Sequence, residues 1–261
     1  MSSEPKSFYK YCPIYDFSSL EKEYSLINLF ERQVTFSTRN NFNDLFDSKV
    51  DFITPAKKEI RDLLPLLNRS EKKDLQNTFL GAKGEENIID LICKINDIFD
   101  KYLFYCVTDD EKNNLMWSHY ANSHKGFCIE WDSEQIKAQK VSYKNSIASF
   151  KIIDLIKLSY HLIGKGDPGK RIWDALRVKL CEWEYESEYR FQLSNNMQDL
   201  IKVNHGNFAL ISHEPEWIKS IIFGCRMDRA CKKYIMENLP YIVQFKEVVE
   251  GKSSLLIKNI K

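Results

Sequence analysis

The sequence contains little glycine and proline. Only 9 of its 261 residues are glycine and 7 are proline, which argues against a disordered or solenoid chain. No apolar run approaches the ~20 residues that a helix needs to span a bilayer. The N-terminus also lacks the apolar segment of a signal peptide. We therefore expect a cytoplasmic protein without a membrane partner.

A metal-binding pattern and a charge imbalance are also lacking. The 7 cysteines are irregularly spaced and form no C-x-x-C pair, which argues against structural zinc. The histidines have no partners at metal-ligand spacing, so we assign no metal ligand. The 38 basic and 37 acidic residues leave a net charge of +1. A chain this close to neutral carries no global electrostatic footprint for nucleic acid.

Enough apolar residues are present to build a packed core, because 43% of the chain is hydrophobic and 13% aromatic. Short strands and helices follow one another without regular βαβ alternation, which predicts an α+β fold. We expect a single domain over 1–261, with two small, mostly antiparallel sheets that form a cleft flanked by helices. Residues 55–100 are predicted to be a helical insertion without catalytic residues.

Hydrophobic periodicity gives the expected elements. Predicted helices cover residues 18–31, 86–100, 111–122, 149–163 and 169–181, and predicted strands cover 7–12, 34–38, 102–107 and 126–131.

The most informative segment is the one that contains E-x-E-Y-R, at residues 186–190. In a strand, side chains alternate between the two faces. One face would carry Glu186, Glu188, Arg190 and Gln192, and the other Tyr189, Phe191 and Leu193. Two carboxylates and a guanidinium are costly to bury unless they are paired. The polar face is therefore either a solvated ion-pair ladder or the wall of a polar cleft, and the surrounding aromatic residues favour the cleft.

Four other clusters combine polar and aromatic residues. They are Tyr9-Lys10-Tyr11, the loop Asn43-Asp44-Leu45-Phe46-Asp47, the block Met116-Trp117-Ser118-His119-Tyr120, and His124-Lys125-Gly126. Each also has a structural interpretation. The tyrosines and Trp117 can be core residues, and Asp44 and Asp47 can form turn bonds to their own backbone. His124 can belong to a loop that starts the next strand.

Taken in order, these clusters resemble the bacterial domain-of-unknown-function family numbered two-nine-seven-one. Members of that family show a "KY" start, an "FNDPFD" loop, an "MWSHYA…HKGFCIEFD" block and a "W-x-Y-E-x-E-Y-R" strand. This chain departs from the pattern in the loop, where Leu45 replaces proline. The family label names no activity.

A more distant similarity is to ADP-ribosyltransferases, which bind NAD in a cleft between two small sheets. There the first strand contacts the adenosine-side ribose, a middle aromatic residue lies under nicotinamide, and a late glutamate contacts the nicotinamide ribose. The resemblance implies that Glu188 and Glu186 are catalytic and that Arg190 can hold Glu188 ionised. It implies cofactor-binding roles for Tyr9, Lys10, Tyr11, Asp44, Trp117, His119, Tyr120 and Arg190. We expect Tyr11, Asp44, Trp117, His119 and Glu188 to line one pocket.

The resulting hypothesis is an NAD-dependent ADP-ribosyltransferase-like enzyme, a toxin or phage-defence effector, that modifies a protein or nucleic-acid acceptor. Two alternatives remain open. A magnesium-dependent nuclease or hydrolase could use Asp44, Asp47, Glu186 and Glu188, since hard cations prefer oxygen ligands. A non-catalytic module could instead bind a nucleotide or a partner protein through the aromatic-lined cleft.

Overall fold

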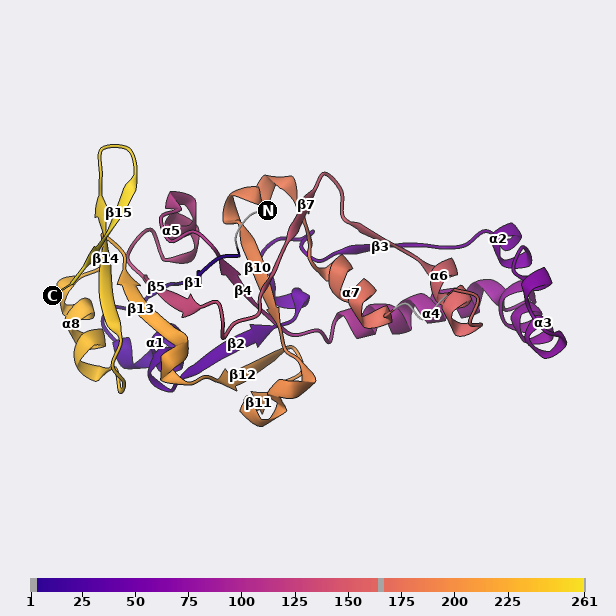
Figure 1. Ribbon diagram of the computed structural model, residues 1–261, viewed down its shortest axis with the longest axis horizontal. Coiled ribbons are helices and arrows are strands. Elements are labelled where there is room, and N and C mark those ends of the chain that lie inside the picture. The colour runs from indigo at the N-terminus through magenta and orange to yellow at the C-terminus, as the bar shows by residue number, and fades with distance from the viewer. Residues whose placement is uncertain (1–3, 164–166, 261) are drawn as a thin grey trace. The chain divides into compact units, whose positions relative to one another are not determined.

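The computed structural model describes residues 4–163 and 167–260, which form two compact units. Unit 1 contains residues 1–41, 103–141 and 182–261, and unit 2 contains residues 42–102 and 142–181. The expected mixed α+β class is confirmed (Figure 1). Unit 2 is larger than the predicted insertion at 55–100, because it begins at residue 42 and also includes residues 142–181. The single-domain organisation of the whole chain stays a prediction.

The described residues of unit 1 are built on one eleven-stranded sheet. Its strands are β1 (Ser7–Cys12), β2 (Gln33–Ser37), β4 (Phe104–Thr108), β5 (Phe127–Asp132), β6 (Gln139–Lys140), β10 (Glu188–Gln192), β11 (Ile201–Asn204), β12 (Phe208–Ser212), β13 (Ile218–Phe223), β14 (Gln244–Glu250) and β15 (Leu255–Asn259). The main path runs β11-β12-β2-β4-β1-β5-β13-β14-β15, and β10 pairs with β4 and β6 beside it.

The pairings are antiparallel except between β13 and β14, which are parallel and are joined through helix α8 (Arg229–Asn238). The sequence predicted two small sheets, and the observed strands of unit 1 instead form one. The link is β4, which pairs with β1 at Thr108, with β2 at Phe104, and with β10 along its other edge. The predominance of antiparallel pairing agrees with the prediction.

Alternation along the strands gives the sheet of unit 1 two apolar faces. Helices α1 (Tyr24–Phe30) and α8 contribute to the larger core, together with Phe8 of β1 and Tyr189 of β10. Helix α5 (Asn114–Tyr120) packs on the opposite face, where Trp117 joins Tyr11, Cys128 and Ile222. The predicted helix 111–122 is shorter in the structure because the side chain of Asn113 caps its N-terminus.

Unit 2 combines helices with two short parallel strand pairs, β3–β8 and β7–β9. Its strands are β3 (Val50–Ile53), β7 (Ser142–Lys144), β8 (Ala148–Lys151) and β9 (Val178–Leu180), and its helices are α2 (Lys57–Arg61), α3 (Arg69–Leu75), α4 (Gly84–Phe99), α6 (Ile152–Ser159) and α7 (Pro168–Leu176). Both helices predicted after residue 148 were too long. Residues 148–151 and 178–180 are strands, because they pair with partners that are remote in sequence.

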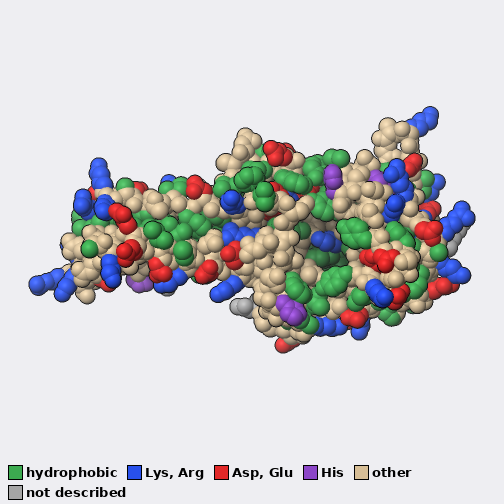
Figure 2. Space-filling model, turned by 180° about the vertical axis from the view of Figure 1, so that it is seen from behind, with side chains coloured by type: hydrophobic (Ala, Val, Ile, Leu, Met, Phe, Trp, Pro, Cys, Tyr) green, Lys and Arg blue, Asp and Glu red, His purple; other side chains and the backbone are tan. Residues whose placement is uncertain are grey.

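The surface reflects the balanced composition. Acidic and basic side chains are interspersed over the face shown in Figure 2, with apolar side chains between them. Among the residues that the structure describes, no helix is long and apolar enough to cross a membrane. All seven cysteines are free, with Cys128 buried and Cys106 half-buried.

One buried histidine of unit 1 predicts a pH-dependent stability. His213 is buried against the edge of Trp131, and its Nδ1 lies 3.0 Å from the Glu214 carbonyl oxygen. Burial lowers the pKa of His213 to about 4. The unfolded chain therefore takes up the proton first as the pH falls from about 6.5. Stability from the neutral ring is fully present above that pH and is lost toward pH 4, by up to about 3 kcal/mol.

We expect His213→Gln to flatten the pH dependence of the free energy of unfolding between these limits, measured by urea denaturation. His205→Gln, at an exposed histidine of the same unit, should leave that dependence unchanged. Parallel curves for wild type and His213→Gln would contradict the prediction.

Candidate functional site

A row of polar side chains crosses the central strands of unit 1 on the face that α5 covers. Glu188 of β10 lies opposite Thr108 of β4, Thr108 opposite Tyr9 of β1, and Tyr9 opposite Glu130 of β5. Directly opposed residues of antiparallel strands share a face. This row places the predicted catalytic strand and the predicted first strand on either side of β4.

Glu188 and Arg190 form a buried ion pair at one end of the row. Arg190 Nε donates to Glu188 Oε1 over 2.7 Å. Arg190 is 0% exposed and Glu188 is 5% exposed. The guanidinium also lies 4.9 Å from the ring centre of Phe104. Burial, with Glu188 nearby, raises the pKa of the Cys106 thiol well above its usual value. The pair is thus a desolvated charge cluster beside a neutral thiol, and the solvated-ladder alternative does not describe it.

Glu186 is also buried, but it does not belong to the strand. It ends a 3₁₀ helix over Cys181–Glu186, and Ser187 has a φ of 44°, so the backbone turns before β10 begins. Glu186 Oε1 accepts a hydrogen bond of 2.5 Å from the Tyr120 hydroxyl. The prediction that Glu186 and Glu188 share one face of a strand is therefore wrong, although both carboxylates are buried in unit 1. Glu186 connects the turn to helix α5.

Partly exposed aromatic rings surround that connection. The ring of His119 lies 6.4 Å from that of Tyr120 and 6.2 Å from that of Tyr185, and Tyr185 lies 6.1 Å from Trp183. Asn113 Nδ2 donates to the Tyr185 carbonyl oxygen over 2.5 Å, which fixes the turn to the start of α5. We call Trp183, Tyr185, His119 and Tyr120 the ring cluster. Sequence reasoning did not assign Trp183 and Tyr185 to the site, and the aromatic residues around the E-x-E-Y-R segment were the available signal.

Trp117 and Tyr11 are core residues of unit 1. Trp117 is 0% exposed, its ring meets that of Tyr11 edge-on at 5.0 Å, and its Nε1 donates to the Glu111 carbonyl oxygen over 2.9 Å. The Tyr11 hydroxyl donates to the Asp110 carbonyl oxygen over 2.7 Å. These contacts fit the packing interpretation. A cofactor role for either residue stays a prediction that no contact supports.

The other two residues of the first-strand cluster lie on opposite faces of β1. Lys10 Nζ donates to the Cys106 carbonyl oxygen over 3.1 Å and lies 5.0 Å from the ring centre of Tyr105. Lys10 thereby satisfies a backbone acceptor of β4 on the side of the larger core, which accounts for it without a pyrophosphate. Tyr9 lies in the polar row and packs against the core under α5.

The Asn43–Asp47 loop belongs to unit 2, where turn chemistry accounts for most of its contacts. Asp44 Oδ1 accepts from the Phe46 backbone N–H over 2.9 Å, while its Oδ2 is buried without a hydrogen-bond partner. Asp47 forms a buried ion pair of 3.2 Å with Lys179. That Asp44 lines one pocket with Tyr11, Trp117, His119 and Glu188 stays a prediction.

His124 serves the packing of the loop after α5. Three successive residues, Asn122, Ser123 and His124, have positive φ, and the His124 ring stacks on Trp117 at 6.3 Å. A Cβ on Gly126 would lie 2.1 Å from the Cys12 carbonyl oxygen, so the strand that follows needs glycine there. These contacts support the structural interpretation of the His124-Lys125-Gly126 segment.

Glu130 is a buried carboxylate that sequence reasoning missed. It accepts hydrogen bonds from Ser7, Ser220 and Lys246, the last over 2.6 Å. Burial alone would raise the pKa of Glu130, but these donors outweigh it and lower the pKa below the usual value. A single glutamate inside the apolar run Phe127–Asp132 was the available signal.

Two further features bear on ligand chemistry. Among the described residues, no group of three or more histidine, cysteine, aspartate or glutamate side chains is placed to hold a metal ion, so the magnesium alternative has no ligand set there.

Residues 164–169 have the spacing G-x-G-x-x-G. Residues 164–166 lie outside the described residues. The segment follows helix α6, whereas a dinucleotide fingerprint follows a strand.

Residues 116–191 match the family described as protein of unknown function (DUF2971). The matched segment contains both the M-W-S-H-Y block and the E-x-E-Y-R strand, and it supports the resemblance to that family. No curated protein and no solved structure matches the chain significantly.

Proposed function

We propose that the chain is an ADP-ribosyltransferase-like enzyme that uses NAD as the donor. The observation that supports this function is the buried Glu188–Arg190 pair, with Glu186 beside it in sequence and bonded to Tyr120. Through these contacts the E-x-E segment meets the aromatic helix α5, and through β4 it faces the first strand. These are the three segments that the proposed chemistry needs close together.

In the proposed reaction, the bond between nicotinamide and C1′ of its ribose breaks, and its electron pair leaves with nicotinamide. The ribose then carries oxocarbenium character, which a nearby carboxylate stabilises. An acceptor nucleophile forms the new bond to C1′ and loses its proton. Atoms and charge balance without a metal or a redox partner.

Glu188 is assigned to the developing cation, because Arg190 fixes its position on a central strand. Glu186 is assigned to orienting the acceptor or supporting Glu188. The exposed ring of His119 and the half-exposed rings of Tyr120 and Tyr185 are better placed than the buried Trp117 to stack on nicotinamide. The acceptor is a protein or a nucleic acid, and a toxin or phage-defence role in the cytoplasm is part of the proposal.

The test is nicotinamide release from NAD by wild type and Glu188→Gln, with protein and nucleic-acid acceptors present. The substitution keeps the shape and removes the charge, so we expect the barrier to rise by about 2–4 kcal/mol. NAD affinity should change far less, because the charge acts mainly in the transition state.

Glu130→Gln is the matched control, since it also neutralises a buried, hydrogen-bonded carboxylate of the same sheet. It should retain activity in proportion to its folded fraction. Equal losses in the two variants would assign Glu188 to structure rather than to catalysis.

A binding module is the second candidate, and the 5% exposure of Glu188 favours it. In that case the ring cluster would hold a nucleotide or a partner while the buried pair only supports the sheet. NAD would then bind without turnover. Glu188→Gln would lower the stability of the protein, and neither wild type nor variant would release nicotinamide.

A further inference from the structure

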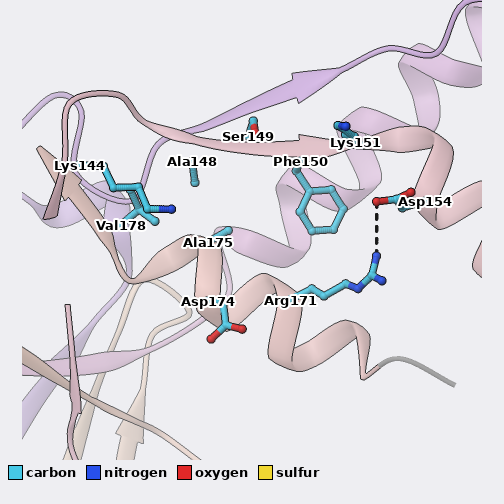
Figure 3. A pocket seen from close by; sticks show the side chains of 10 residues that line it. All are labelled: Lys144, Ala148, Ser149, Phe150, Lys151, Asp154, Arg171, Asp174, Ala175 and Val178. Carbon is cyan, nitrogen blue, oxygen red and sulfur yellow. Dashed lines mark ion pairs between the residues drawn. The ribbon is translucent and has the colours of Figure 1, made fainter. Parts of the chain in front are cut away.

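Unit 2 contains a groove that has no part in the proposed chemistry. It lies between strand β8 and helix α7, with a volume of about 430 Å³. Its buried apolar lining comes from Ala148, Phe150, Ala175 and Val178. This volume is within the range of small-molecule pockets. In Figure 3 the Phe150 ring points from β8 into the space above α7.

The apolar lining is held in place before any ligand arrives. The Phe150 ring meets Phe99 edge-on at 5.6 Å and Phe52 at 6.2 Å. Phe99 belongs to α4 and Phe52 to β3, so contacts with two different elements hold the Phe150 ring in place. A preformed apolar surface of this kind can bind a flat apolar group without the entropy cost of ordering a loop.

Three cations and two carboxylates line the groove. Lys144 and Lys151 line it, and no ion pair joins either to another described residue. Arg171 forms an ion pair with Asp154 at 3.6 Å, which is longer than a hydrogen bond. Lys144 and Arg171 approach from opposite ends, with Phe150 between them (Figure 3).

The second carboxylate of the groove does not offset these cations. Asp174 accepts 2.6 Å hydrogen bonds from both Lys170 and Arg177. This carboxylate lines the groove, but two cations already pair with it. The groove therefore joins a fixed apolar floor to cations with spare hydrogen-bond donors.

We propose that this groove binds a small molecule that carries an anionic group on a flat apolar body. The flat body rests on Phe150 and Val178, and the anion pairs with Lys144 or Arg171. A sulfonate, carboxylate or phosphate shares the needed chemistry.

The test uses anilinonaphthalene sulfonate as an anionic probe and N-phenylnaphthylamine as its uncharged counterpart, in fluorescence titrations of the full chain. We expect Lys144→Glu to weaken sulfonate binding about tenfold or more, which corresponds to about 1.4 kcal/mol. Arg171→Gln should weaken it in the same direction. Added salt should also weaken it, because partly exposed charges are screened.

Lys94→Glu is the matched control, since Lys94 is an exposed lysine of the same unit outside the groove. It should bind both probes as wild type does. Ala175→Leu, which fills the groove, should abolish binding of both probes while circular dichroism stays unchanged. Equal sulfonate affinity in Lys144→Glu and Lys94→Glu, or retained binding in Ala175→Leu, would overturn the proposal.

Discussion

Replacing Arg190 by methionine is expected to destabilise the protein by about 3–5 kcal/mol, because it removes the guanidinium that compensates the buried carboxylate of Glu188. Arg190 is fully buried and donates to Glu188 over 2.7 Å. Removing one partner of such a pair costs far more than the pair itself contributes. The measurement is the free energy of unfolding from urea denaturation at neutral pH.

The matched control for this prediction is Arg226→Met. Arg226 faces Glu250 at 4.0 Å with both side chains well exposed, and exposed pairs contribute at most about 1 kcal/mol. The double variant Glu188→Gln/Arg190→Met should recover part of the loss, since it also removes the buried negative charge. Similar losses in Arg190→Met and Arg226→Met would contradict the stabilising role of the buried pair.

Trp117→Ala is expected to cost about 3–5 kcal/mol of stability, the scale for truncating a large buried aromatic side chain. The Trp117 ring fills the core under α5, and its Nε1–H satisfies a backbone carbonyl. His119→Ala, on the same helix but exposed, should change stability by about 0.5 kcal/mol or less. Thermal and urea unfolding of both variants measure the difference.

The same two variants also separate packing from ligand binding at the M-W-S-H-Y block. If Trp117 is a core residue and the ring cluster binds NAD, Trp117→Ala loses stability, while His119→Ala weakens NAD binding. A stable Trp117→Ala variant that loses only ligand affinity would contradict the core assignment.

Alternation in the E-x-E-Y-R segment could be predicted from the sequence, because a strand has a fixed period. Tyr189 and Phe191 pack with the larger core, while Glu188 and Arg190 occupy the other face, as expected. The position of Glu186 outside this strand could not be predicted. It depends on the positive φ of Ser187, and a serine gives no local signal for that conformation.

Elements that depend on remote partners were the ones mispredicted. The sequence predicts residues 149–151 and 178–180 to be parts of helices, but β8 pairs with β3 and β9 pairs with β7. Single-segment periodicity cannot reveal a partner many residues away. The same reason explains why the strands of unit 1 were assigned to two sheets, since β4 joins three partners.

The contacts of the candidate site could be predicted only in part, because they too depend on partners that are remote in sequence. Residue types showed that Glu186, Glu188 and Arg190 needed partners, and the structure provides them. The sequence could not show that Tyr120, rather than Trp117, would reach Glu186. Nor could it show that the lone glutamate in β5 would gather two serines and a lysine from β1, β13 and β14.

The proposed transfer of ADP-ribose from NAD is tested most directly by the stoichiometry of its products. Wild-type chain is incubated with NAD and with separate protein and nucleic-acid acceptor pools. Released nicotinamide is quantified by chromatography, and ADP-ribose adducts by mass spectrometry. We predict one adduct for each nicotinamide released with one acceptor class, and far slower formation of both products with Glu188→Gln. NAD that binds yet stays intact with every acceptor class would contradict the enzyme and leave the binding module.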